Sequence, residues 1–300
     1  MSTMKNFVIA GVGRIGEYVA EEFLKLKASG SVSSLTVLTR STASDNAVLE
    51  KVVKLGAQVT TVDYNAHDSL VSALTGVDAV VSALGGYGHK AQYQLADAAK
   101  AAGVKLFLPS EWGLYSRGVT DGFYAAHDAV HKHLEKIELP YALFYNGMWS
   151  DMMFNPYAGW NIPQGKITIW GEGNTPITWT TRRDAARFVA HLLTHIPVDQ
   201  LAGKAFSVEG DRKTLNELVE GYTARTGKRL EVTHLPIAEQ EKIMKEESQF
   251  AFKGIMAYLL VCYDRGAVDL RTTSPEGVAN GLWPEWNPKP AVDVLVEAYP

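Results

Sequence analysis

The chain has 300 residues, of which 46% are hydrophobic and 21% charged, and its formal net charge is −4 at pH 7. This composition is typical of a globular protein with one large or two modest domains, and the absence of a long basic run argues against nucleic acid or an anionic membrane as a partner. Cys262 is the only cysteine, which excludes an intrachain disulfide, and the lack of a signal peptide or a membrane-length apolar run predicts a cytoplasmic protein.

The first elements predict a nucleotide-binding turn. The apolar run 7–10 predicts a buried strand, and apolar residues recur at helical spacing over 18–26. Between them, Gly11 permits a tight turn, Gly13 lets the backbone approach a pyrophosphate, and Gly16 lets the helix pack closely on the sheet. The alternative is a glycine-rich turn without a ligand. The residues expected to contact a dinucleotide here are Gly11, Gly13, Arg14, Ile15 and Gly16.

The second predicted strand, over 35–39, ends at Arg40. An acidic residue at this position usually binds the ribose 2′-hydroxyl of NADH, whereas a basic residue suits the 2′-phosphate of NADPH. Arg40, followed by Ser41, therefore predicts NADPH as the cofactor. The alternative is a solvated arginine at a strand end.

Helices and strands continue to alternate through the first half. The predicted helices cover 47–55, 68–74, 89–102 and 123–138, and the predicted strands cover 58–62, 78–83, 104–108 and 141–145. This alternation predicts an α/β fold with a Rossmann-type, doubly wound parallel sheet in a domain over 1–150. Gly85 follows the fourth strand and Ser110 the fifth, so both are expected at the cofactor crevice, with a plain loop as the alternative for the glycines.

Beyond Asn146 the sequence becomes richer in aromatic residues, methionine and proline. Strands are predicted over 166–170, 205–208 and 230–234, and helices over 183–195, 214–226, 237–247 and 250–263. We expect a smaller mixed α/β substrate-binding domain over 151–300, partly interleaved with the first, with the helix over 183–195 packing back onto it. The candidate substrate-contacting residues are Glu111, Trp112, Tyr115, Met148, Trp149, Met153 and Phe154. For the aromatic residues and methionines, an ordinary core between the domains is an equal alternative.

Four segments together resemble a known family. They are 11–16, 38–42, 92–103 and 104–113. The last reads Val-Lys-Leu-Phe-Leu-Pro-Ser-Glu-Trp-Gly and is the most specific. The chain resembles the atypical short-chain dehydrogenases that include NmrA-like proteins and isoflavone reductase-like, phenylcoumaran benzylic ether reductase-like enzymes. The resemblance covers the part of the chain up to Trp149 and is weak beyond it.

This resemblance implies an NADPH-binding fold and, for the plant enzymes, reduction of aromatic small molecules. Those enzymes use a lysine on the helix after the serine–glutamate motif, and His127 occupies that position here. A histidine can donate or accept a proton near neutral pH, and Tyr124 lies one helical turn earlier, so both are the predicted catalytic residues. The alternative is that His127 is a polar helix residue, like His131 and His133.

The predicted function is an NADPH-dependent reductase of a small aromatic or conjugated molecule, acting as a monomer or homodimer. Two alternatives stay open: a non-catalytic NADP-binding regulator that senses redox state, and a redox-neutral isomerase or cyclase on the same fold. No metal site is expected, because His191 and His195 share a helix face without the glutamate of a zinc motif.

Overall fold

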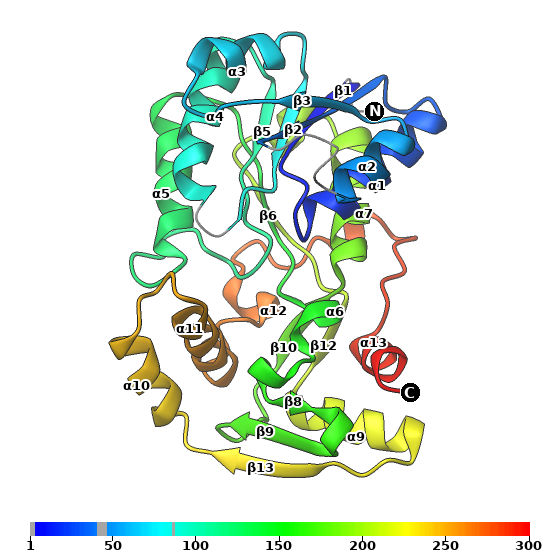
Figure 1. The fold of residues 1–300 in the computed structure, drawn as a ribbon, viewed down its shortest axis with the longest axis vertical. Helices are drawn as coiled ribbons and strands as arrows, with labels where there is room; N and C mark the ends of the chain where they lie inside the picture. The colour runs from blue at the N-terminus through cyan, green and yellow to red at the C-terminus, as the bar shows by residue number, and fades with distance from the viewer. Residues whose placement is uncertain (1–3, 41–46, 86–87) are drawn as a thin grey trace.

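The computed structural model describes residues 4–40, 47–85 and 88–300. Figure 1 shows an elongated molecule in which a parallel sheet with its helices forms one end and a smaller mixed part forms the other. Among the described residues, no helix combines the length and apolarity that a membrane span requires.

A parallel sheet organises the first part. Its order is β3-β2-β1-β4-β5, with strands β1 (Asn6–Ala10), β2 (Ser34–Thr39), β3 (Gln58–Thr61), β4 (Ala79–Ser82) and β5 (Leu106–Leu108). A parallel bridge from Phe107 to Tyr141 leads on to β6 (Leu143–Tyr145), which pairs in parallel with β11 (Ala205–Ser207). The central strands are apolar because helices cover both faces of the sheet. The predicted Rossmann-type, doubly wound fold is confirmed.

Helices from both halves of the chain cover this sheet. On one side lie α3 (His67–Leu74), α4 (His89–Ala101) and α5 (Ala125–Lys136), and on the other lie α1 (Gly16–Ala28), α2 (Ala47–Lys54) and α7 (Arg182–His195) (Figure 1). Helix α7 packs directly against α1, so the second half supplies a helix as well as strand β11 to the first part. The division into domains at residue 150 stays a prediction.

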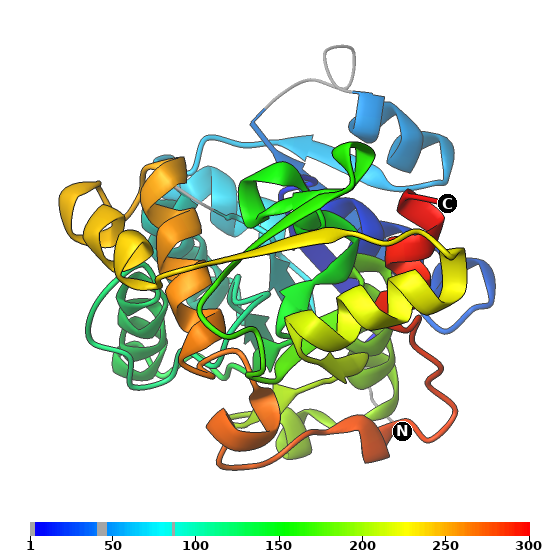
Figure 2. The same cartoon turned by 90° about the horizontal axis from the view of Figure 1, so that it is seen from below.

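The smaller part contains two three-stranded sheets and peripheral helices. The sheets are β12-β10-β7 and β13-β9-β8, from β7 (Met148–Trp149), β8 (Trp160–Asn161), β9 (Lys166–Trp170), β10 (Ile177–Thr180), β12 (Asp211–Lys213) and β13 (Glu231–Leu235). The helices are α6 (Ser150–Met153), α9 (Leu215–Thr226), α10 (Ala238–Glu246), α11 (Phe252–Asp264), α12 (Leu270–Thr273) and α13 (Ala291–Ala298), whereas α8 (Val198–Leu201) packs with the core of the main sheet. Figure 2 shows β13 crossing this part between α9 and the pair formed by α10 and α11.

A buried carboxylate ties together three strands at the amino edge of the main sheet. Asp78 Oδ2 accepts hydrogen bonds from the backbone N–H groups of Lys5 (2.7 Å) and Asn6 (2.8 Å), and Oδ1 pairs with Lys105 Nζ at 2.7 Å. Burial by itself would raise the pKa of Asp78, but Lys105 and the two N–H donors hold it below its usual value. The ionised carboxylate therefore stabilises the native sheet.

We expect Asp78→Asn to lower the free energy of unfolding by about 1–3 kcal/mol at pH 7, because the amide loses the ion pair and one acceptor. A depressed pKa stabilises the fold above the unfolded value of about 3.9, so the difference from wild type should persist down to about pH 4 and shrink at lower pH. Urea unfolding at several pH values measures this. Asp68→Asn, at an exposed position, is the control, and equal stability of wild type and Asp78→Asn would contradict the prediction.

Candidate active site

One cavity lies at the carboxyl edge of the main sheet. It has a volume of about 600 Å³ and is lined by residues that follow four neighbouring strands: Gly11 after β1, Arg40 after β2, Asp63 after β3 and Ala83 after β4. Strands β2 and β4 lie on opposite sides of β1, so the cavity sits where the strand order reverses. In open α/β sheets, ligands bind at this switch point.

The three glycines of the first turn have different surroundings. Gly11 has φ +91°, a left-handed conformation that favours glycine, and it lets the chain turn off β1. A Cβ added to Gly16 would lie 2.0 Å from the Gly11 carbonyl oxygen, so Gly16 is required for packing of α1. A Cβ added to Gly13 would meet nothing within 4 Å, which means that the Gly13 backbone faces the open cavity.

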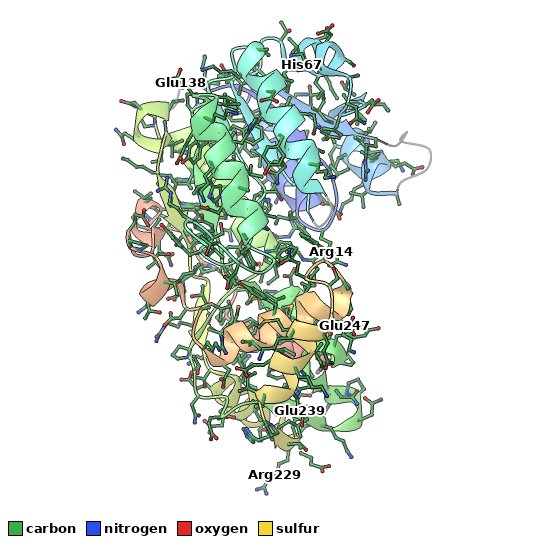
Figure 3. All side chains as sticks on the ribbon, turned by 90° about the vertical axis from the view of Figure 1, so that its left-hand side faces the viewer. Arg14, His67, Glu138, Arg229, Glu239 and Glu247 are labelled. Carbon is green, nitrogen blue, oxygen red and sulfur yellow. The ribbon has the colours of Figure 1, made fainter. Side chains whose placement is uncertain are left out.

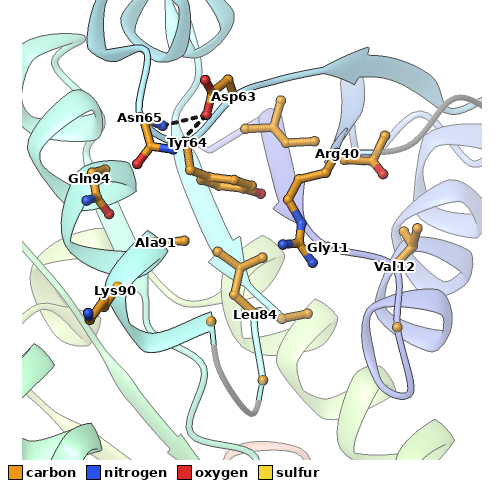
Figure 4. A pocket seen from close by; sticks show the side chains of 16 residues that line it. Gly11, Val12, Arg40, Asp63, Tyr64, Asn65, Leu84, Lys90, Ala91 and Gln94 are labelled. Carbon is orange, nitrogen blue, oxygen red and sulfur yellow. Dashed lines mark hydrogen bonds between the residues drawn. The ribbon is translucent and has the colours of Figure 1, made fainter.

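Polar groups stand around this cavity (Figure 4). The Arg40 guanidinium points into it between Tyr64 and Leu84, and Lys90 on α4 lies on the opposite wall. Burial raises the pKa of Tyr64 to about 12, even though Arg40 opposes this shift. Asp63 accepts hydrogen bonds from the backbone and side-chain N–H groups of Asn65, at 2.9 and 3.0 Å. Ser41, the predicted neighbour of Arg40, lies outside the described residues.

A second cavity, of about 490 Å³, adjoins the first. Gly13, Ala83 and Gly85 line both, so the two cavities meet at the end of β4. The second cavity is mainly apolar, and most of its apolar and aromatic side chains come from the segment just before α5 and from β7, α6 and α11. They are Phe123, Tyr124, Met148, Trp149, Met152, Met153, Ile255 and Leu259. Figure 3 shows Arg14, another lining residue, at the junction of the two parts of the molecule.

Most predicted site residues line these cavities. Those in the first cavity are Gly11, Gly13, Arg40 and Gly85. Those in the second are Gly13, Arg14, Ile15, Gly85, Ser110, Glu111, Trp112, Tyr124, His127, Met148, Trp149 and Met153. Gly16 lines neither cavity, because it packs against the Gly11 carbonyl. Their roles in binding and catalysis stay predictions.

The structure does not bring two predicted substrate residues into the cavity. Tyr115 packs against Tyr145, with ring centroids 4.8 Å apart, and Phe154 packs between Trp160 and Trp179 in the core of the smaller part. Both predictions rested on aromatic character, which a core residue shares with a residue that lines a cavity.

Sequence reasoning also missed several lining residues. Asp63, Tyr64 and Asn65 follow the third predicted strand, and the shared carboxyl edge of the sheet was a signal that could have located them. Ile255 and Leu259 lie four residues apart on α11, a spacing that a buried core helix shows equally well. No sequence signal distinguished these two residues from ordinary core residues.

A buried polar cluster lies beneath the second cavity. The Glu111 carboxylate, whose side chain is 1% exposed, accepts hydrogen bonds from His131 Nε2 at 2.7 Å and Ser116 Oγ at 2.5 Å. His127 Nδ1 lies 3.4 Å from Glu111 Oε2. Burial would raise the pKa of Glu111, but the two imidazoles outweigh this effect and hold the pKa well below its usual value. Glu111 is therefore an anion between two histidines of α5.

Tyr124 is placed differently from His127. Its ring centroid lies 4.9 Å from that of His127, and both residues line the cavity. A Cβ added to Gly113 would lie 2.4 Å from the Tyr124 hydroxyl oxygen, so this hydroxyl is directed at the backbone of the loop after β5. Burial raises the pKa of Tyr124, which keeps the phenol protonated at neutral pH. Both predicted catalytic residues therefore line the cavity, and both ring nitrogens of His127 are buried.

Within 4–40, 47–85 and 88–300, no group of three or more histidine, cysteine or acidic residues is arranged to hold a metal ion. The His191 and His195 rings stack on each other with centroids 4.2 Å apart, and His191 also stacks on Trp283 at 4.3 Å.

Comparison with known proteins finds a matching family model, similar plant proteins and solved structures of the same fold. The model of the NmrA-like family matches residues 3–288. Isoflavone reductase homolog P3 of Arabidopsis thaliana is 27% identical over 95% of this chain and 96% of its own length. Phenylcoumaran benzylic ether reductase TP7 of Nicotiana tabacum is 28% identical over 81% of this chain and 80% of its own length. The NADPH complex of leucoanthocyanidin reductase from Vitis vinifera has the same fold, with a TM-score of 0.84, 21% identity and coverage of 97% of this chain and 98% of its own.

Proposed function

The chain belongs to the NmrA-like family, and we propose that it is an NADPH-dependent reductase of small aromatic or conjugated molecules. One observation carries the proposal. A cavity of mixed polar and apolar lining at the glycine turn meets, at Gly13, Ala83 and Gly85, a mainly apolar cavity that His127 lines. This arrangement can hold a dinucleotide with its reactive end beside an apolar substrate. The names of the relatives, which include a phenylcoumaran benzylic ether reductase, support the same reaction class.

The first cavity fits NADPH. The open space at Gly13 accommodates a pyrophosphate close to the backbone, at the start of α1. Ile15, the N-cap residue of α1, supplies no side-chain cap, so the positive end of the helix dipole faces that position. Arg40 points into the same cavity and suits the 2′-phosphate. Bound NADPH supplies the hydride for the reaction.

The residues of the second cavity supply the rest of the chemistry. Its apolar walls, among them Met148, Trp149 and Met153, exclude water and pack against an aromatic ring. When a conjugated carbonyl accepts the hydride at carbon, its oxygen gains negative charge and needs a proton. His127 donates that proton to the oxygen and regains one from solvent, so that the atoms and charges balance. The Glu111 carboxylate, 3.4 Å from Nδ1, stabilises the positive charge that the imidazole carries when it holds the proton to be donated.

A substrate screen tests the proposal. Purified protein is incubated with NADPH and a panel of aromatic enones, ketones and quinones, and NADPH oxidation is followed by its absorbance, with product identified by mass spectrometry. We expect one product molecule for each NADPH oxidised. If NADPH binds and no member of a broad panel is reduced, the proposal fails and a cofactor-sensing regulator or a redox-neutral enzyme becomes the better reading.

We expect Arg40→Ala to weaken NADPH binding by about 10–100-fold and to leave NADH binding nearly unchanged, because only NADPH carries the 2′-phosphate that a charge-assisted bond can hold. Calorimetric titration of both cofactors measures this. Arg229→Ala is the matched control, since Figure 3 places Arg229 at the far end of the smaller part. Equal affinity of the wild type for NADPH and NADH would remove the basis for the prediction.

A further inference from the structure

We propose that Glu111 and His131 form a buried pair that positions the His127 imidazole and is electrostatically coupled to it. The effect of this pair on turnover rests on the proposed reductase function. The electrostatic coupling itself can be measured without turnover.

The loop after β5 holds Glu111 firmly. Trp112 has φ +42°, a left-handed conformation that is uncommon for a residue other than glycine, and its indole Nε1 donates a 2.9 Å hydrogen bond to the Ser82 carbonyl at the end of β4. Gly113 then leaves room for the Tyr124 hydroxyl. Ser116 donates to Glu111 Oε2 and lies 3.3 Å from the Tyr145 hydroxyl. The carboxylate is therefore fixed from the sheet side and from the loop.

His131 fixes the other carboxylate oxygen. It is 2% exposed, and its Nε2 lies 2.7 Å from Glu111 Oε1, whereas Nδ1 lies 3.8 Å from Asp128 Oδ1. Asp128 is held by the Gly118 N–H at 2.7 Å and by Lys132 Nζ at 2.7 Å. His131 thus stands between two carboxylates that other groups hold in place, which defines its ring orientation. His131 itself is not among the residues that line the second cavity.

His127 completes the cluster. Its Nδ1 lies 3.4 Å from Glu111 Oε2, and its ring lines the cavity while both ring nitrogens are buried. A carboxylate at this distance in a buried site favours the charged imidazole. His127 and His131 are four residues apart on α5, and the spacing of one helical turn lets both reach the same carboxylate.

The other titratable groups around the cluster do not supply the negative charge that faces His127. They are Tyr124, Tyr145, Tyr258 and Cys262, with Asp128 and Lys132 on α5 and Arg14 across the cavity. Burial raises the pKa of the three tyrosines, and it raises the pKa of the Cys262 thiol to about 12, so these groups are neutral at pH 7. Burial would also raise the pKa of Asp128, but Lys132 and the Gly118 N–H hold it below its usual value, and Asp128 and Lys132 form an ion pair of their own. Glu111 is therefore the carboxylate that faces His127.

Histidine NMR tests the coupling directly. The Cε1–H signals of the NADP⁺-saturated protein are titrated with pH, and His127→Gln identifies the His127 signal. In Glu111→Gln, which keeps the shape of the side chain and removes its charge, we expect the titration midpoint of His127 to move to lower pH by about one unit or more. His133→Gln is the matched control on the same helix, because His133 pairs with Asp97 at the surface instead. A midpoint that does not move in Glu111→Gln overturns the inference.

Kinetics separate positioning from a merely structural role. With a substrate from the screen, Glu111→Gln and His131→Gln should each lower kcat by about 10-fold or more while KM and NADPH affinity stay near wild type. The double variant should lose little more than the worse single variant, since the two residues act on one group. Additive losses, or losses confined to KM, contradict the pair. If Glu111→Gln does not fold, Glu111→Asp is the substitute. It keeps the carboxylate but moves it away from His127, because the side chain is one methylene shorter, so the His127 titration midpoint should shift less and in the same direction.

These outcomes distinguish the two proposals. A wild-type protein that reduces nothing in the panel contradicts the reductase function, and the NMR titration still decides whether Glu111 is coupled to His127. If the enzyme is active but Glu111→Gln leaves the titration midpoint of His127 unchanged, only the inference is contradicted.

Discussion

His127→Ala is expected to lower kcat by about 10²–10⁴-fold, which is the usual contribution of a positioned general acid. His127 lines the apolar cavity, and its Nδ1 lies near the buried Glu111 carboxylate. Since the cavity of the glycine turn is otherwise unchanged, NADPH affinity should stay close to wild type. The pH–rate profile should also lose a limb near neutrality. Steady-state kinetics on the substrate found by the screen, with NADPH titration alongside, measure all three effects.

Two variants sharpen this experiment. His133→Ala removes a part-buried histidine of the same helix that pairs with Asp97 instead of Glu111, and it should leave the kinetics unchanged. His127→Lys introduces the residue type that the family resemblance implies, and it should recover part of the activity because an ammonium can also donate a proton beside Glu111. A loss of NADPH affinity with intact turnover at saturation would instead mean that His127 positions the ribose. Wild-type kinetics in His127→Ala would discard both roles and direct attention to Tyr124.

Gly13→Val is expected to abolish NADPH binding while the chain still folds. A Cβ at this position meets no atom within 4 Å, so the folded protein accommodates the substitution. The branched side chain then fills the space that the pyrophosphate needs at the start of α1. Calorimetric titration with NADPH, together with circular dichroism and thermal unfolding of the variant, measures the two effects separately.

Gly16→Val is the matched control for the same motif. Its Cβ would lie 2.0 Å from the Gly11 carbonyl oxygen, so the turn or α1 must shift. We expect this variant to lose about 2–4 kcal/mol of stability, whereas Gly13→Val loses binding with a stability near wild type. Tight NADPH binding by Gly13→Val would mean that this turn is not the phosphate site.

The sequence by itself determined the first half of the molecule. The strands that end at Ala10, Thr39 and Ser82 and the helices between them were predicted to within a few residues. Their signals are local, because an apolar run, a glycine turn and a helical period are all read within one short window. The alternation of these elements then implied a parallel sheet, and the sheet placed the glycine turn, Arg40 and Ser110 at one edge.

In the smaller part, the elements predicted over 166–170, 214–226, 230–234, 237–247 and 250–263 match β9, α9, β13, α10 and α11 to within two residues, but other elements depended on contacts that no local window contains. Strands such as β7 and β8 have two residues each, too few for a period, and they exist because β10 and β9 pair with them. The prediction for the helix over 183–195 succeeded, since α7 carries a long amphipathic pattern and returns to pack on α1. Long, periodic elements were therefore predicted wherever they lie in the chain, whereas the two-residue strands were not.

The site shows the same division. Residue type and position after a strand located Ser110 and Glu111, and the resemblance located His127. Only the tertiary structure separated Tyr115, which packs on Tyr145, from Trp149, which lines the cavity, since both are aromatic residues with the same sequence signal. Likewise, the approach of His131 to Glu111 requires α5 to fold back over the loop after β5. The sequence specified which chemical groups are available, and the packing of distant segments decided which of them share a cavity, because side-chain proximity across 20 or more residues is a property of the folded chain.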